Sequence, residues 1–536
     1  MAATRKGWSI KTKAILSIVI VVVAAVVGAV GYNYYLGLAE KEQQSRTLII
    51  AYTVEATTLD PAIDIYASTE NIWHAIYDTL LQYDVNKLKT GEYVLAPSLA
   101  ETWQVSDDRL QWTFNLRHDA KFAASGNPVN AQAVKFSFER FTKLNQSQVL
   151  FMYDAFQSID VVDNYTVRIT LKYPFTPILS ILSQPFSSII DPSILQYEKN
   201  GDFGSNWLAD HSAGSGPYVL ESFTRNTEVV LTRNDQYWKG PSYFEKVIYK
   251  SIPEHSEQAM MLRRGDADIA CNLLAEDIPA MQNTTSLNVV TSPSMWSSML
   301  YVNLNVKPME NPMIREAIRY AIDYEGLVKI AAGGQGVVMQ TPVVKGVLYY
   351  DEEFAHHYTH DVQKAKQLLA EAGYPNGIDL GYLDFPYLSL LFSLEKTAVK
   401  IQSDLADAGI TVQLRGAETG TWWNNGLDGK WGALIVSASG YDYPDPDEFA
   451  YLLSPTSIGG MLGWTDSQYM SLILQARGMP DSPERDGLYK EIQQKLIEGP
   501  YVFLQQPFLV FGASRSLNNV VWNVFAQGPE VAFMSR

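Results

Sequence analysis

Residues 95–122 read LAPSLAETWQVSDDRLQWTFNLRHDAKF, and residues 126–140 read GNPVNAQAVKFSFER. The first stretch predicts short strands over 103–107 and 110–117, because Trp, Val, Thr and Phe recur there around a Ser-Asp-Asp turn. The second predicts a turn followed by a helix over 131–144, with Asn130 as its N-cap. Strands that feed a capped helix indicate a mixed α/β fold.

The same signals recur along the rest of the chain. Helices are expected over 71–81, 313–322, 361–372 and 394–408, and strands over 47–54, 218–223, 229–233 and 410–414. A hairpin is expected within 161–171, and the Gly-Ser-Gly-Pro run at 214–217 predicts a break that can mark a crossing between lobes. The alternation predicts a mixed sheet covered by helices.

Size and charge restrict the class of protein. The chain has 536 residues, of which 47% are hydrophobic and 12% aromatic, so two or three folded lobes are expected rather than a disordered chain. Four basic residues precede the first acidic one, Glu40, which leaves 37 basic against 58 acidic residues, a net −21, in the part after Leu38. Such a body would be repelled by phosphate backbones, so nucleic-acid binding is excluded.

The N-terminal segment predicts a membrane anchor. No charged residue occurs between Ala14 and Leu38, about 25 residues, and roughly 20 apolar residues span a bilayer as a helix. Basic residues lie only on the near side of this run, which predicts a cytoplasmic stretch at 1–13, a single-pass anchor at 14–38, a tether at 39–46 and an extracytoplasmic body. A cleaved signal peptide is the alternative, but its apolar core is usually about 7 to 15 residues.

Searches for catalytic and metal-binding patterns find no complete motif. The sequence has no phosphate loop, zinc-binding HExxH helix, GxSxG nucleophile elbow or GxGxxG turn after a strand. The only cysteine, Cys271, lies in an apolar stretch, which favours a buried residue over a nucleophile. His356, His357 and His360 are close in sequence, but no spaced carboxylate or thiol completes a metal site. We expect neither a metal nor a cofactor, and no enzyme activity.

Four segments in order resemble the family 5 solute-binding proteins of ABC importers, the class that binds dipeptides, oligopeptides or nickel. They are residues 95–140, residues 214–237 (GSGPYVLESFTRNTEVVLTRNDQY), residues 302–328 (VNLNVKPMENPMIREAIRYAIDYEGLV) and residues 361–377. The resemblance covers the chain from Thr47 almost to its end. It implies a periplasmic-binding-protein fold of type II, cluster C, in which two hinged lobes and an extra domain follow the predicted transmembrane helix.

The resemblance also implies how the chain is divided and what it contacts. Lobe I would comprise 47–85, 216–302 and 506–536, the extra domain II 86–215, and lobe III 303–505. The body is expected to be monomeric, to close on a short peptide between its lobes, and to deliver that peptide to permease subunits served by a separate ATPase. Closure is expected because a ligand that makes its full contacts only in the closed form shifts the population toward that form.

The same resemblance names candidate site residues within DYPDPDEF, residues 442–449. Asp442 matches the aspartate that receives a peptide's α-amino group, and a carboxylate in a dry cleft does require a cation. Tyr441 and Tyr443 flank it and are candidates for the cleft wall. Trp422 and Trp423 are candidates too, because aromatic rings suit both peptide side chains and sugar faces.

Two other functions remain open at this point. An oligosaccharide receptor on the same fold fits the aromatic content, because some members of the resembled family bind sugars. An extracellular hydrolase is the third candidate function, but the sequence shows no nucleophile, metal-ligand set or acid pair that supports it.

Overall fold

A computed structural model describes residues 46–53, 56–63, 67–146, 150–271, 273–387 and 392–536. The predicted cytoplasmic stretch, the anchor and nearly all of the tether, residues 1–45, lie outside the described residues. Across the ranges that are described, no helix has both the length and the apolarity needed to cross a membrane.

Residues 100–171 form a small antiparallel domain, here called the four-stranded domain. Its strands are β4 (Ala100–Val105), β5 (Gln111–Leu116), β6 (Phe156–Asp163) and β7 (Thr166–Leu171), in the order β4-β5-β7-β6. Helix α4 (Ala131–Leu144) packs on β6 and β7. Asn130 caps this helix by accepting a hydrogen bond from the Ala133 N–H at 3.0 Å, and the helix ends at Asn145 in the left-handed region. The strands and the capped helix predicted from this stretch are confirmed.

A 12-stranded mixed sheet runs through the rest of the molecule, in the order β16-β15-β17-β13-β18-β11-β1-β10-β9-β8, with β12 and β14 also paired to β18. The long strand β18 (Tyr501–Ser514) joins its two halves. Residues 501–505 of β18 pair with β13 (Trp296–Val302), whereas residues 508–514 pair with β12 (Leu287–Pro293). The chain therefore crosses near Gln506 and Pro507 from one half of the sheet to the other.

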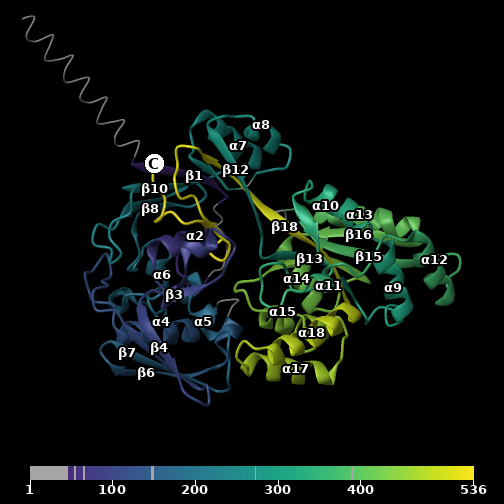
Figure 1. Cartoon of the computed structure of the whole chain (residues 1–536), viewed down its shortest axis with the longest axis horizontal. Coiled ribbons are helices and arrows are strands. Elements are labelled where there is room, and N and C mark those ends of the chain that lie inside the picture. Colours follow the sequence, from purple (N-terminus) through teal and green to yellow (C-terminus); the bar gives the residue numbers. More distant parts are fainter. Residues whose placement is uncertain (1–45, 54–55, 64–66, 147–149, 272, 388–391) are drawn as a thin grey trace, which may run out of the picture.

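Figure 1 shows the resulting two lobes, with β18 passing between them. We call the part that holds β1 to β12, the four-stranded domain and residues 508–536 the first lobe. Its other elements are β1 (Thr47–Tyr52), α2 (Ala67–Ile76), β2 (Leu81–Tyr83), α3 (Val85–Leu88), β3 (Leu95–Pro97), α5 (Ile178–Ile181), α6 (Ser205–Leu208), β8 (Tyr218–Thr224), β9 (Glu228–Arg233), β10 (Lys246–Ser251), α7 (His255–Arg264), β11 (Ile269–Ala270), α8 (Ile278–Gln282), β19 (Trp522–Asn523) and β20 (Gly528–Pro529).

The second lobe holds β13 and the elements that follow it up to residue 506. They are α9 (Pro312–Ala321), α10 (Tyr324–Ala331), β14 (Gly336–Val338), α11 (Glu352–Ala355), α12 (Val362–Glu371), β15 (Ile378–Pro386), α13 (Leu394–Asp407), β16 (Ile410–Ala417), α14 (Thr419–Leu427), β17 (Leu434–Gly440), α15 (Asp447–Leu452), α16 (Ile458–Met461), α17 (Ser467–Gly478) and α18 (Pro483–Glu498). Helices α9, α12 and α13 and strand β16 confirm the predicted pattern to within a few residues.

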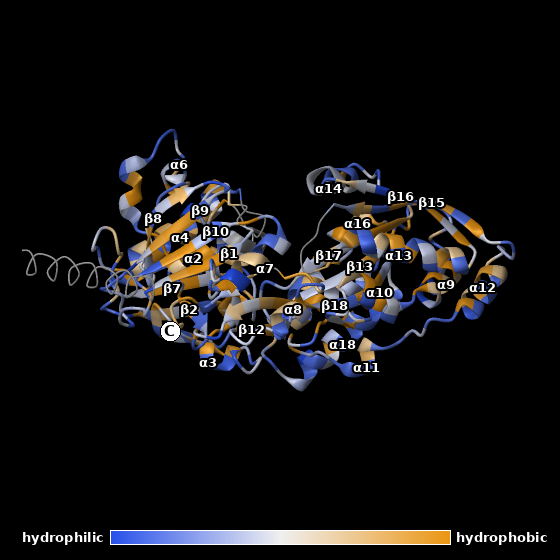
Figure 2. Ribbon diagram, turned by 90° about the horizontal axis from the view of Figure 1, so that it is seen from above, coloured by the Kyte–Doolittle hydropathy of each residue, from blue (hydrophilic) through white to orange (hydrophobic). Residues whose placement is uncertain are grey.

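The hydrophobic core follows the two lobes. Figure 2 shows apolar residues concentrated on the sheet and on the inward faces of its helices, with hydrophilic residues in surface loops. One buried cluster lies wholly in the second lobe, around Ile318, Leu369 and Ile401. A larger cluster contains Tyr218 and Tyr249 of the first lobe and extends through Tyr83 to Tyr441 of the second. The two lobes therefore pack against each other in this structure.

The helix predicted over 71–81 ends earlier than expected, at Ile76. The run Gly214-Ser215-Gly216-Pro217 approaches it there, and the Gly216 N–H donates to the Ile76 carbonyl oxygen at 2.9 Å. A Cβ at Gly214 would lie 2.2 Å from the same oxygen, so only glycine fits. A segment more than a hundred residues away takes the carbonyl and helps end α2, which a local pattern does not reveal.

Candidate ligand-binding site

The predicted site segment lies on the side of the second lobe that faces the first. It connects β17, which pairs with β13 in the middle of the sheet, to α15, and Figure 1 places α14 and α15 toward the first lobe. Neighbouring residues touch that lobe: a Cβ at Gly346 would lie 3.1 Å from the ring of Tyr93 and 2.9 Å from Met295. The Tyr441 N–H donates to the Met295 carbonyl oxygen at 2.8 Å, which fixes the segment to β13 at the crossing.

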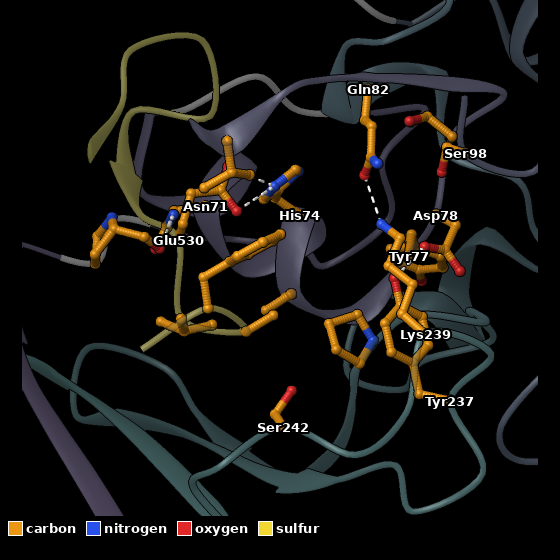
Figure 3. Close-up of a pocket in the computed structure, with 18 of the residues that line it drawn as sticks. Asn71, His74, Tyr77, Asp78, Gln82, Ser98, Tyr237, Lys239, Ser242 and Glu530 are labelled. Atoms are coloured by element: carbon orange, nitrogen blue, oxygen red, sulfur yellow. Dashed lines mark hydrogen bonds and ion pairs between the residues drawn. The ribbon is translucent and has the colours of Figure 1, made fainter. Parts of the chain in front are cut away.

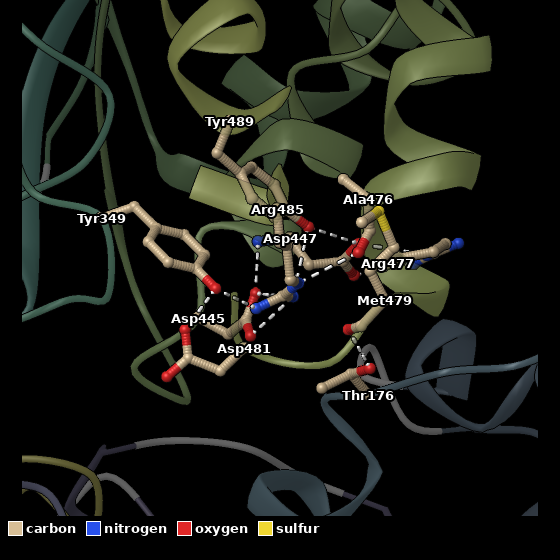
Figure 4. Close-up of polar contacts among 10 residues, drawn as sticks. All are labelled: Thr176, Tyr349, Asp445, Asp447, Ala476, Arg477, Met479, Asp481, Arg485 and Tyr489. Carbon is tan, nitrogen blue, oxygen red and sulfur yellow. Dashed lines mark hydrogen bonds and ion pairs between the residues drawn. The ribbon is translucent and has the colours of Figure 1, made fainter. Parts of the chain in front are cut away.

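Two of the segment's carboxylates are held by buried arginines. Asp445 accepts two hydrogen bonds of 2.8 Å from Arg485, and Asp447 accepts hydrogen bonds of 3.1 and 2.8 Å from Arg477 (Figure 4). Tyr489 donates a further hydrogen bond to Asp447 at 3.3 Å. A buried charge is tolerated when it is paired in this way. These two carboxylates therefore stabilise the turn and are not free to receive a ligand.

Asp442 differs from them because it has no basic partner. It is half-buried, and in the part of the chain that the structure describes no lysine or arginine forms an ion pair with it. Its backbone N–H donates to Glu448 Oε2 at 2.9 Å, and the two side-chain carboxyls are hydrogen-bonded to each other. A partly buried carboxylate that lacks a cation is suited to receive one from a ligand.

Burial raises the pKa values of both carboxyl groups. Burial raises the pKa of Asp442 to about 6, and the hydrogen bond with Glu448 offsets part of that rise. Burial, followed by repulsion from the Asp442 charge, raises the pKa of Glu448 well above its usual range. We infer that Glu448 holds the proton and donates it to Asp442, which leaves Asp442 as the anion.

The neighbouring tyrosines are packed rather than open. Tyr441 is 3% exposed, stacks on Phe449 with ring centroids 4.1 Å apart, and donates its hydroxyl to the Pro342 carbonyl at 2.9 Å. Tyr443 is 1% exposed. In this arrangement both residues shape the turn that carries Asp442, and a direct contact of either with a ligand stays a prediction.

The two tryptophans of α14 differ from each other. Trp422 is buried against Trp431, with ring centroids 5.0 Å apart, and its carbonyl accepts the Trp431 indole N–H at 3.0 Å. Trp423 is 38% exposed. Packing accounts for Trp422, so Trp423 is the better candidate for a ligand-facing ring.

Some residues of the site region were not predicted from sequence. Glu448 could have been proposed from the sequence, because it is a second carboxylate, six residues after Asp442, near the start of the next helix. Arg477 and Arg485 could not have been found in this way, because they are 30 and 40 residues from their aspartates. They reach them only in the fold, where α17 packs on both α15 and α18.

A separate cavity of about 260 Å³ lies inside the first lobe (Figure 3). His74 forms an ion pair of 3.0 Å with Glu530, which outweighs burial and raises the pKa of His74. Lys239 donates to the Gln82 side chain at 2.6 Å. Asp78 accepts hydrogen bonds from Ser215, Tyr237 and Trp238. Each of these charged groups thus has a hydrogen-bond or ion-pair partner, and none of the predicted site residues lines the cavity.

The ionisable side chains give no metal site. Among the residues that the structure describes, no group of three or more His, Cys, Asp or Glu is arranged to hold a metal ion. His356 contacts Glu352 at 3.3 Å, and Cys271 is buried.

Comparisons with known proteins identify the family. The model for bacterial extracellular solute-binding proteins, family 5 Middle, matches residues 94–460. The probable D,D-dipeptide-binding periplasmic protein DdpA of Escherichia coli (strain K12) is 32% identical over 485 residues, which cover 89% of this chain and 91% of the relative. The glutathione-binding protein GsiB of Pectobacterium atrosepticum is 28% identical, over 88% of this chain and 91% of the relative.

A solved structure supports the same family assignment. The periplasmic binding protein DppA from Helicobacter pylori, in complex with the peptide STSA, superposes with a TM-score of 0.75 at 27% identity and covers 89% of this chain and 96% of its own. The chain therefore belongs to the family 5 bacterial extracellular solute-binding proteins, which bind solutes and are not enzymes.

Proposed function

We propose that this chain captures short peptides between its lobes and delivers them to the permease of an ABC importer, with Asp442 receiving the peptide's α-amino group. The observation that carries the proposal is the contrast within one turn. Asp445 and Asp447 are each paired with arginine, whereas the side chain of Asp442 is hydrogen-bonded, among the described residues, only to a second carboxyl group. The relatives support the ligand class, because DdpA is described as dipeptide-binding and DppA holds a peptide.

The site is tested by thermal unfolding of the full chain with trialanine, N-acetyl-trialanine and maltotriose, because a ligand that binds only the folded state raises the midpoint. We expect trialanine to raise the midpoint and N-acetyl-trialanine, which has no ammonium group, to leave it unchanged. Asp442→Asn should abolish the rise. Asp428→Asn, which changes an exposed aspartate paired with Lys430 at the end of α14, should keep it.

The test also decides the alternative ligand class. The exposed ring of Trp423 favours an oligosaccharide as the second candidate, since sugars stack on open aromatic faces. A rise with maltotriose alone, insensitive to Asp442→Asn and lost in Trp423→Ala, would replace the peptide assignment and keep the role in import.

We further propose the membrane topology and the domain division that the sequence predicts. Residues 14–38 would anchor the body outside the cytoplasm, and residues 47–85, 216–302 and 506–536 would form lobe I, 86–215 domain II and 303–505 lobe III. The anchor is tested by fractionation: the full chain should stay with membranes after a high-salt wash, and a chain that begins at Glu40 should be released. Equal release of both chains would indicate a cleaved segment.

A further inference from the structure

The segment that leaves the four-stranded domain touches the second lobe at the end of α17. The backbone N–H of Thr176 donates to the carbonyl oxygen of Arg477 at 2.8 Å, and the Thr176 hydroxyl donates to the carbonyl oxygen of Met479 at 2.5 Å (Figure 4). The last carbonyls of a helix have no donor within the helix. A residue of one lobe therefore caps a helix of the other.

The two surfaces are in close contact around this cap. A Cβ at Gly478, the last residue of α17, would lie 3.3 Å from the carbonyl oxygen of Pro174 and 3.4 Å from its side chain. Phe175 is only 4% exposed, and the Arg477 guanidinium of the second lobe lies over its ring. The two surfaces are therefore closely packed at this point, and the Phe175 ring is shielded from solvent.

Arg477 links this contact to the site segment. Its guanidinium group makes the bidentate ion pair with Asp447 described above, and its central carbon lies 4.9 Å from the ring centroids of both Phe175 and Tyr451. A guanidinium over an aromatic ring is attracted by the ring's negative face, and most strongly where water is excluded. One side chain thus holds both the turn that carries Asp442 and a ring of the opposite lobe.

We propose that Thr176, Phe175 and Arg477 form a latch that keeps the lobes shut over a ligand held at Asp442, with Arg477 as the positioning residue. A ligand ammonium bound at Asp442 restrains the turn, the turn restrains Arg477 through Asp447, and Arg477 presents its planar group to Phe175. When the lobes part, water replaces Thr176 as the hydrogen-bond donor to the carbonyls of Arg477 and Met479. The latch therefore stabilises the closed form only modestly, and ligand binding still decides whether the lobes are closed. The inference rests on the proposed function at Asp442.

The test uses the full chain, with trialanine as the probe ligand. Thr176→Val keeps the shape of the side chain and the backbone N–H but removes the hydroxyl that bonds Met479. We expect the dissociation rate of trialanine, followed by tryptophan fluorescence in stopped flow, to rise roughly two- to tenfold, and the association rate to change little. The matched control is Thr142→Val, the same change in the four-stranded domain at a hydroxyl that bonds only its own helix. Its rates should equal those of the unaltered chain.

A distance measurement reports the latch without ligand. Fluorophores attached through Asp160→Cys on β6 and Gln494→Cys on α18 span the two lobes at exposed positions, and the only natural cysteine, Cys271, is buried. Thr176→Val should shift the distribution of distances toward longer values. Arg477→Lys keeps the charge but loses the bidentate, planar contact, so it should shift the distances in the same direction while N-acetyl-trialanine stays excluded.

The outcomes separate the two proposals. If Thr176→Val matches Thr142→Val in both dissociation rate and label distance, the latch is wrong. If trialanine does not bind the unaltered chain, the proposed ligand is wrong, and the label distances of unliganded Thr176→Val still decide whether the latch holds the lobes.

Discussion

Asp442 is a carboxyl group without an arginine partner in a turn whose two other aspartates are each paired with arginine. Three acidic side chains lie within six residues, and burial acts on all of them, but two are held by arginine and the third is hydrogen-bonded to Glu448. A carboxyl whose pKa is raised by burial reduces the stability of the folded chain at neutral pH. Such a cost is consistent with the role that we propose for Asp442, the binding of a ligand's ammonium group.

Peptide binding should therefore weaken in acid. The raised pKa of Asp442, about 6, means that the carboxylate which binds an ammonium group is present above that pH and is lost as the pH falls through it. The Kd of trialanine, measured by calorimetry, should be about tenfold higher at pH 5 than at pH 7, where the carboxylate and the peptide ammonium are both mostly ionised. Other ionisable groups nearby are Glu448 and Asp445, whose pKa values are raised mainly by burial, and Tyr441 and Tyr443, whose raised pKa values lie far above this range. A Kd that stays constant from pH 7 to pH 5 would remove Asp442 as the amine acceptor.

At the scale of elements, the sequence predicts what is encoded locally. Helices α4 and α12 begin where it places them because Asn130 and Asp361 accept hydrogen bonds from backbone N–H groups three residues ahead, at 3.0 and 2.8 Å. Such caps depend only on neighbouring residues. The order of family-like segments likewise predicts the two-lobed fold.

The parts that were not predicted depend on contacts across long stretches of chain. Nothing near Asp447 in sequence shows that Arg477 will neutralise it, and nothing near Tyr441 shows that its ring will be buried on Phe449. The candidate site was therefore predicted as a list of neighbours around Asp442. The structure adds which of those neighbours are committed to packing.

The end of α2 at Ile76 depends on a close contact with Gly216. A Cβ at Gly216 would lie 2.5 Å from the backbone carbon of Ile76 and 2.6 Å from its oxygen, and backbone atoms cannot move aside cheaply. Gly216→Ala should lower the free energy of unfolding by about 2 kcal/mol or more, measured by urea denaturation. The control is Gly487→Ala in the exposed part of α18, where nothing lies within 4 Å of the added carbon. That change should raise the free energy by about 0.5–1 kcal/mol, since alanine favours helix. Equal effects would show that the contact at Ile76 does not constrain the chain.

For the whole molecule, two crossings of the chain lie side by side between the lobes. One is the link from β12 to β13 at Ser294, and the other is β18 at Gln506 and Pro507. The Ser294 hydroxyl donates to the Pro507 carbonyl at 2.7 Å, and the Gln506 amide donates to the carbonyls of Ser294 and Lys345 at 2.7 and 3.0 Å. The hinge is thus a hydrogen-bonded pair of strands rather than a loose linker, which favours rotation of the lobes as rigid bodies.

Adjacent glutamines of that hinge should respond in opposite directions to the same change. Both are fully buried, but Gln506 is satisfied, whereas both amide atoms of Gln505 and the Ser298 hydroxyl across the ladder have no hydrogen-bond partner among the described residues. Gln505→Met removes an unpaired group of similar shape and should raise the free energy of unfolding by about 1 kcal/mol. Gln506→Met removes the hydrogen bonds to the Ser294 and Lys345 carbonyls and should lower the free energy of unfolding by about 2 kcal/mol. If both variants lose stability alike in urea, the amide of Gln505 is satisfied by ordered water, and its burial carries no cost of the expected size.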